Sequence, residues 1–208
     1  MNSGEIREYK ASLKLTPRQR EIVVGLLLGD GHLETQNAGR TFRLKVEHGP
    51  AQEEYVKWLF TEFAEWVRAD SPYRKVAKDG RVSFGFTTYS HGAFRFYGQQ
   101  FYSETRKKII PRHIVKLLTP LSLAVWYMDD GSKKSKRHLT YNIHTLGFTK
   151  LELQNMCVVL QEKFGIETRL HSQKQQYWRI YIPSNSAASF KELIMNHIKE
   201  IPSMMYKL

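Results

Sequence analysis

The chain has 208 residues, a formal net charge of +12 and a hydrophobic fraction of 41 %. That apolar content excludes wholesale disorder. The one cysteine, Cys157, excludes an intramolecular disulfide framework and any cysteine-based zinc cluster. No apolar run approaches the roughly 18 residues that cross a bilayer, so no membrane partner is expected. The positive charge favours an anionic partner, and nucleic acid is the first candidate.

The N-terminal lead, residues 1–14, does not read as a targeting segment. Residues 1–10 are polar and mixed in charge, unlike a secretory signal. We therefore expect an intracellular protein, from a bacterial cytoplasm or the interior of an organelle. The sequence sets neither the host nor the compartment.

A capped apolar helix is the first predicted element. Thr16 can cap it, Pro17 suits its first turn, and the apolar run ends at Gly29, Asp30 and Gly31. Residues 41–47 then alternate apolar and polar side chains, as a half-buried strand does. A helix follows with its buried face on Val56, Leu59, Phe60 and Phe63. The first half continues with predicted strands at 73–78 and 81–88, a helix at 94–102 and a final segment at 110–117.

The same order of elements returns in the second half. Thr119 and Pro120 open another apolar stretch, which ends at Asp129, Asp130 and Gly131. The alternating segment 139–144 follows, then a helix with Leu153, Met156, Cys157 and Leu160 on one face. Predicted strands at 166–171 and 177–182, a helix at 186–198 and a segment at 201–208 complete the repeat. Such duplication predicts an α+β fold in two αββαββα halves, 1–117 and 118–208. No Gly/Ser-rich or Pro-rich linker separates the halves, so we expect them to pack closely.

Asp30 and Asp130 stand at matching positions in the two copies. Each falls at the C-terminal end of a predicted helix, where a carboxylate is unfavourable unless something positive offsets it. Asp-Gly is also an ordinary turn dipeptide, and one copy alone would favour that interpretation. If the two helices pack side by side, with Gly25 and Gly29 allowing close approach, both carboxylates meet at one end. Two carboxylates and helix-terminal carbonyls form a hard-oxygen site suited to Mg²⁺.

Residues 23–31 and 123–131 resemble the nine-residue signature of the LAGLIDADG homing endonucleases, in the single-chain, two-motif branch. The resemblance extends over residues 9–208. It implies two four-stranded antiparallel sheets that form a DNA-binding saddle along the major groove. Asp30 and Asp130 would hold the metal together with the helix ends at Gly29 and Asp129, and the terminal position favours the side chain of Asp130 over that of Asp129. Leu28 and Met128 occupy the earlier acidic position of the signature, which in the family is not the metal ligand.

The activity that the resemblance implies is Mg²⁺-dependent cleavage of both DNA strands, leaving 3′ overhangs. Mn²⁺ would substitute, whereas Ca²⁺ would bind without supporting cleavage. One monomer would occupy a long, non-palindromic site. The family often places a lysine beside the reacting phosphate, and Lys108 and Lys207 are the best matches. The internal repeat pairs Lys207 with Lys116 instead; we prefer Lys108, and the competing interpretation is that these are surface lysines.

Strand alternation separates the candidate DNA contacts from the core. With Phe42, Leu44 and Val46 facing inward, the residues between them face outward, and Leu139, Tyr141 and Ile143 are the inward set of the second half. Outward polar side chains can read base edges, and basic turns can hold phosphates. The candidates in the first half are His32, Glu34, Gln36, Arg40, Arg43, Lys45, Glu47, Arg74, Lys75, Lys78, Arg81 and Ser83. Those in the second half are Lys133, Lys134, Lys136, Arg137, His138, Thr140, Asn142, His144, Arg169, His171, Lys174, Tyr177, Arg179 and Tyr181.

Two rival functions remain open at this stage. The chain could be a maturase that binds its host intron RNA, or a nuclease-dead DNA-binding protein of the same fold. The presence of both Asp30 and Asp130 favours cleavage, because RNA or DNA binding alone requires neither. Several histidines, among them His48, are scattered without metal-ligand spacing. The target base sequence does not follow from these side chains, since DNA shape and water also contribute to recognition.

Overall fold

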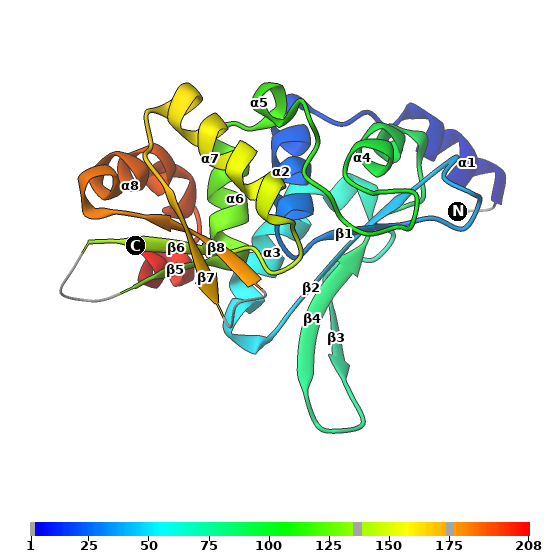
Figure 1. Cartoon of the computed structure of the whole chain (residues 1–208). Helices are drawn as coiled ribbons and strands as arrows, with labels where there is room; N and C mark the ends of the chain where they lie inside the picture. The colour runs from blue at the N-terminus through cyan, green and yellow to red at the C-terminus, as the bar shows by residue number, and fades with distance from the viewer. Residues whose placement is uncertain (1–2, 135–138, 174–176) are drawn as a thin grey trace.

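The computed structural model describes residues 3–134, 139–173 and 177–208. Figure 1 shows two long helices side by side at the centre, with one β-sheet on either side of them. The elements of the first half are α1 (Ser3–Ser12), α2 (Pro17–Leu28), β1 (His32–Glu34), β2 (Arg43–His48), α3 (Glu53–Glu62), β3 (Tyr73–Val76), β4 (Val82–Thr87), α4 (Arg95–Gln100) and α5 (Ile114–Leu117). Short 3₁₀ turns lie at Pro50–Gln52, Ala64–Trp66 and Gly92–Phe94.

The second half repeats this order after α5. Its elements are α6 (Pro120–Asp130), β5 (Gly131–Lys133), β6 (Tyr141–His144), α7 (Lys150–Phe164), β7 (Arg169–Gln173), β8 (Tyr177–Ile182), α8 (Ser184–Ile198) and the 3₁₀ segment η4 (Pro202–Lys207). The division of the chain at residue 117 stays a prediction. No helix in the described ranges is both long enough and apolar enough to cross a membrane.

The two sheets have the same topology. The strand orders are β1-β2-β4-β3 and β5-β6-β8-β7, and every neighbouring pair is antiparallel. Their registers also correspond, because His32 lies opposite Lys45 in one sheet and Ser132 lies opposite Asn142 in the other. The predicted α+β fold class, with a four-stranded antiparallel sheet in each half, is confirmed.

Local capping explains where α2 and α6 begin. The Thr16 hydroxyl accepts a hydrogen bond from the backbone N–H of Gln19, and the Gln19 side chain accepts one from the N–H of Thr16. Thr119 and Ser122 make the same reciprocal pair at the start of α6. Such boxes satisfy two backbone donors that a helix leaves free at its first turn. The sequence therefore places these two starts correctly.

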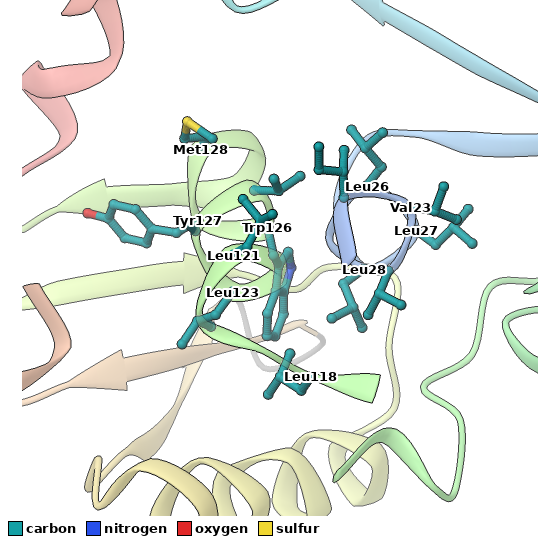
Figure 2. Close-up of a cluster of buried hydrophobic side chains, with 14 of the residues drawn as sticks. Val23, Leu26, Leu27, Leu28, Leu118, Leu121, Leu123, Trp126, Tyr127 and Met128 are labelled. Carbon is teal, nitrogen blue, oxygen red and sulfur yellow. The ribbon is translucent and has the colours of Figure 1, made fainter. Parts of the chain in front are cut away.

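The core runs through both halves and surrounds the central helices. Most of α2 from Ile22 onward and most of α6 are buried, so neither helix has a wide solvent-facing side. Figure 2 shows Trp126 pointing from α6 towards the leucines of α2, whereas Tyr127 points to the opposite side of α6. The two helices thus pack against each other in the core that both halves share.

Several boundaries differ from the sequence predictions. No helix or strand is predicted in the N-terminal lead, yet α1 fills most of it, and the Tyr9 hydroxyl donates to the carbonyl of Glu65 at 2.8 Å. Gln36 and Arg81 lie outside strands because β1 ends at Glu34 and β4 begins at Val82. Leu139 was predicted to face inward but is 37 % exposed, since strand pairing begins only at Tyr141. Half-buried Cys157 lies at the edge of the core.

Candidate functional site

Close contact between α2 and α6 brings the two Asp-Gly ends together. A Cβ atom added to Gly25 would lie 2.6 Å from the Cβ of Val125, and one added to Gly29 would lie 2.6 Å from the Cβ of Asp129. Real Cβ atoms essentially never approach so closely, so both positions require glycine. Each glycine of α2 therefore faces the repeat-equivalent residue of α6. Both helices end at the same place as a result.

A cavity of about 270 Å³ opens where the helices end. Its lining includes Gly29, Asp30, Lys108, Asp130, His144 and Thr145. The Asp30 side chain is 51 % exposed, while Asp130 is largely covered. Two carboxylates in one small cavity supply the oxygen ligands that Mg²⁺ prefers.

The side chain of Asp129 does not line this cavity. Its side chain is fully buried; one oxygen accepts a hydrogen bond from the backbone N–H of Asp30 at 2.8 Å, and the other accepts from the Tyr55 hydroxyl at 2.9 Å. Its carboxylate is thus occupied by protein donors, and among the two neighbouring aspartates it is Asp130 that lines the cavity with Asp30.

The crowded carboxylates have strongly shifted pKa values. Burial, reinforced by the charge of Asp30, raises the pKa of Asp129 to about 7. Burial, reinforced by the charges of Asp129 and Asp30, raises the pKa of Asp130 to about 8. The carboxyls of Asp129 and Asp130 therefore bind a proton more readily than an exposed aspartate does.

One lysine reaches each helix end. Lys108 Nζ donates to the carbonyl of Gly29 at 2.5 Å. Lys207 Nζ donates to the carbonyl of Met128 and to that of Asp129, the latter at 3.2 Å. Because Gly29 and Asp129 are repeat-equivalent, the two lysines are equivalent in space. Burial lowers the pKa of both lysines, and the three aspartates oppose that shift.

Lys116, the alternative to Lys108, lies away from these carboxylates. It is exposed and borders a different cavity, together with Leu13 and Thr119 near the N-terminal ends of the two helices. The pairing that the internal repeat indicated is therefore not the pairing in space.

His48 belongs to this cluster, although it was not among the predicted site residues. Its Nδ1 lies 3.7 Å from an Asp30 carboxylate oxygen, and its Nε2 lies 3.7 Å from one of Asp129. One atom from each of Asp30, His48 and Asp129 falls within 4.8 Å of the others. The ring is buried, which lowers its pKa. Its position at the inward end of β2, after Leu44 and Val46, was the available signal, because a polar residue on a buried face needs a reason.

The outward face of the first sheet carries paired charges. Glu34 accepts from Arg43 at 2.7 Å and lies 3.2 Å from His32 Nε2. Glu47 accepts from the Tyr73 hydroxyl at 3.0 Å and from the Ser83 hydroxyl at 2.9 Å, and the Lys45 ammonium lies 3.7 Å away. The predicted outward residues therefore do share one face, but much of their charge is neutralised locally.

The outward face of the second sheet contains no ion pair among the described residues. Ser132 hydrogen-bonds His144 at 3.0 Å, and the rings of His171 and Tyr181 stack at 4.4 Å. Thr140 and Asn142 were predicted to be open to solvent but are 5 % and 4 % exposed. For Asn142 the reason is its place in the middle of the sheet, between Ser132 and Tyr181. In the described part of the chain, Asn142 Oδ1 and Arg179 Nε have no hydrogen-bond partner.

The other candidate contacts are spread along the turns and outer strands. Arg40, Arg74, Lys75, Lys78, Arg169 and Tyr177 are exposed. Arg81 pairs with Asp79 at 2.7 Å, and Lys133 Nζ donates to the carbonyl of Leu208 at 3.2 Å. Lys134 lies 4.8 Å from the ring centre of Tyr181. Lys136, Arg137, His138 and Lys174 lie outside the described residues.

Comparison with known proteins gives concordant matches. The profile of the LAGLIDADG DNA endonuclease family matches residues 20–190. A probable intron-encoded endonuclease 1 of Wickerhamomyces canadensis is 30 % identical over 215 residues, spanning 100 % of this chain and 91 % of the relative. A cytochrome b mRNA maturase bI2 of Debaryomyces hansenii is 28 % identical over 195 residues, spanning 90 % of this chain and 72 % of the relative. Among solved structures, the homing endonuclease I-WcaI bound to its DNA recognition sequence matches with a TM-score of 0.89 and 30 % identity, over 100 % of this chain and 93 % of that chain.

Proposed function

Because the chain belongs to the LAGLIDADG DNA endonuclease family, we propose that it is a site-specific homing endonuclease that cuts both strands of one long, asymmetric DNA site. The observation that carries this proposal is the pair Asp30 and Asp130, which share a cavity at the ends of two touching helices. Hydrolysis would leave 3′ overhangs. The structure of I-WcaI, a protein of the same fold, is a complex with its DNA recognition sequence, which supports DNA as the substrate class.

Asp30 and Asp130 are the residues that would hold Mg²⁺, with the backbone carbonyls of Gly29 and Asp129 nearby. The fit is chemical, because hard oxygen donors converge in one small cavity. When bound, the metal would lower the pKa of a water molecule and offset charge on the reacting phosphate. Mn²⁺ should substitute; Ca²⁺ should permit binding without cutting.

Side chains of the protein would also act on the reacting phosphates. Lys108 and Lys207 project their ammonium groups to the two helix ends, where negative charge develops during phosphodiester hydrolysis. His48 lies between Asp30 and Asp129, 3.7 Å from a carboxylate oxygen of each. No serine, cysteine or histidine nucleophile is needed for this chemistry.

The outward faces of the two sheets would contact the DNA. Arg, Lys, Asn and Gln side chains read base edges in the major groove, and the exposed basic turns suit phosphate contacts.

A maturase is the second candidate, because the Debaryomyces hansenii relative is named as one. RNA binding does not require two carboxylates in a cavity, so the site favours cleavage over RNA binding alone. A nuclease-dead DNA-binding protein is disfavoured by the same pair.

Incubation with a randomised DNA library and Mg²⁺, followed by sequencing of cut ends, tests the proposal. We expect one non-palindromic site with 3′ overhangs. Absence of cleavage with both Mg²⁺ and Mn²⁺, together with tight binding of structured RNA in a matched titration, would favour the maturase.

A further inference from the structure

Asp129 forms a connection between the two helices that the first half lacks. Its carboxylate lies on α6, accepts from the backbone N–H of Asp30 at the end of α2, and accepts from the Tyr55 hydroxyl on α3. Tyr55 and the Asp129 side chain are fully buried. The repeat-equivalent residue of the first half is Gly29, which has no side chain. This connection therefore acts on one catalytic end only.

The two donors fix the Asp129 carboxylate in one orientation. Each of its two oxygens accepts one hydrogen bond, so the carboxylate cannot turn without breaking both. One of them ends on the peptide of Asp30, so it restrains the backbone from which the Asp30 side chain projects into the cavity. Gly29 is part of the same arrangement, because a side chain there would occupy the space of Asp129.

We propose that Asp129, held by Tyr55, is a positioning residue that orients Asp30, and that cleavage of one DNA strand depends on it more than cleavage of the other. This inference rests on the proposed endonuclease function. It assigns Asp129 a role other than side-chain coordination of the metal.

Three variants separate a positioning role of Asp129 from side-chain coordination of the metal. Asp129→Asn keeps an oxygen to accept from the Asp30 N–H and offers an amide N–H to the Tyr55 oxygen, but removes the charge. Asp129→Gly copies the first half and removes both bonds, while Tyr55→Phe removes one of them. Tyr97→Phe is the matched control, since this buried tyrosine lies on α4 beside a different cavity.

Two measurements are needed. Single-turnover cleavage of a duplex labelled on both strands gives the rate for each strand. Amide hydrogen exchange at Asp30 in the metal-free protein shows whether the Asp30 N–H stays bonded to Asp129, and it needs no catalysis. For Asp129→Gly we expect about tenfold faster exchange at Asp30, and a rate on one strand reduced about tenfold more than on the other. Tyr55→Phe should move both readouts in the same direction by less, and Asp129→Asn should leave both near the wild-type values.

Other outcomes overturn the inference. Loss of cleavage on both strands in Asp129→Asn would make the side chain a metal ligand. Wild-type exchange and an unchanged strand ratio in both Asp129→Gly and Tyr55→Phe would leave the connection without a role. If Asp129→Gly does not fold, the exchange rate at Asp30 and the strand ratio of Tyr55→Phe alone decide whether the connection has a role. A wild-type protein that cuts no DNA would remove the endonuclease proposal, and the exchange data would still show whether Asp129 restrains Asp30.

Discussion

Asp30 and Asp130 are the residues on which cleavage should depend most steeply. Asp30→Asn and Asp130→Asn each remove a charged oxygen ligand but keep the size and shape of the side chain. We therefore expect each variant to abolish double-strand cleavage, by at least about 10²-fold, and to retain DNA affinity. A gel assay with Mg²⁺ and a binding titration with Ca²⁺ measure the two effects separately. Cleavage at the wild-type rate in either variant would remove the argument from paired carboxylates.

Ionisation of the buried aspartates should also appear in the stability of the metal-free protein. The pKa values of Asp129 and Asp130, about 7 and about 8, are raised from the ordinary 3.8, so the folded state binds more protons than the unfolded state between these limits. Their contribution to the free energy of unfolding therefore falls as pH rises from about 4 through about 8. Added Mg²⁺ or Ca²⁺ should restore stability at pH 8, because binding to the folded state stabilises it.

Denaturant titrations in EDTA at several pH values, compared with Asp130→Asn, isolate this effect. The comparison is needed because His48, whose pKa is lowered, contributes a slope of the opposite sign near neutral pH. We expect a steeper fall for the wild type than for the variant. Parallel pH dependences in the two proteins would mean that folding does not shift the pKa of the Asp130 carboxyl.

At the scale of elements, the contact between α2 and α6 determines whether a site exists. Gly25→Ala would force a methyl group against Val125, so we expect it to destabilise the protein by about 1–3 kcal/mol. Val125→Ala in the same chain should relieve part of that cost, giving a coupling energy in a double-mutant cycle. Gly92→Ala is the control, because an added Cβ there meets nothing within 4 Å. Chemical denaturation measures all five proteins, the wild type included, and an unperturbed Gly25→Ala would contradict the close contact.

Local signals explain which elements could be predicted from the sequence. The starts of α2 and α6 depend on Thr-Pro caps within four residues, so no tertiary information was needed. Strand limits depend on partners, and for that reason Arg81 and Leu139 lie just before their strands rather than within them. Boundaries of this kind follow pairing between distant segments, which alternation alone does not encode.

The candidate site was predictable only in part for the same reason. Asp30 and Asp130 stand out because the chain repeats itself. His48 and Tyr55 join them only through folding, since each comes from the buried face of an ordinary strand or helix. Lys108 and Lys207 reach equivalent carbonyls although one precedes its Ile-Pro sequence and the other follows it. Equivalence in space therefore differs here from equivalence in sequence.

At the scale of the whole molecule, the net charge of +12 predicts binding dominated by phosphate contacts. If roughly ten phosphates are neutralised, the logarithm of the association constant should fall with the logarithm of KCl concentration with a slope near −9. A titration in KCl on a DNA duplex measures it, and structured RNA of equal length is the comparison. A slope near zero would mean that the charge serves another purpose, and stronger binding to RNA would favour the maturase.

The two halves share a topology but present different surfaces, so the target should be asymmetric. Glu34 and Glu47 form charged pairs on the first sheet, whereas the second sheet carries Arg179 and the stacked rings of His171 and Tyr181, with no ion pair among the described residues. Charged and neutral side chains pair differently with base edges, so the half-sites should differ in sequence. One chain should then occupy a non-palindromic site without dimerising, which ultracentrifugation of the complex can establish.

Because the two halves differ, the two DNA strands should also be cut at unequal rates. Lys108 holds the carbonyl of Gly29, whereas Lys207 holds two carbonyls beside the buried carboxylate of Asp129. The electrostatic surroundings of the two reacting phosphates therefore differ, and supercoiled plasmid should pass through a nicked intermediate. Lys108→Met and Lys207→Met should each slow one strand more than the other, in opposite senses, by about tenfold or more. Lys116→Met is the matched control, because Lys116 is exposed near the opposite ends of the helices. A stable dimer on a palindrome, or wild-type cutting of both strands by both lysine variants, would contradict this assignment of lysines to halves.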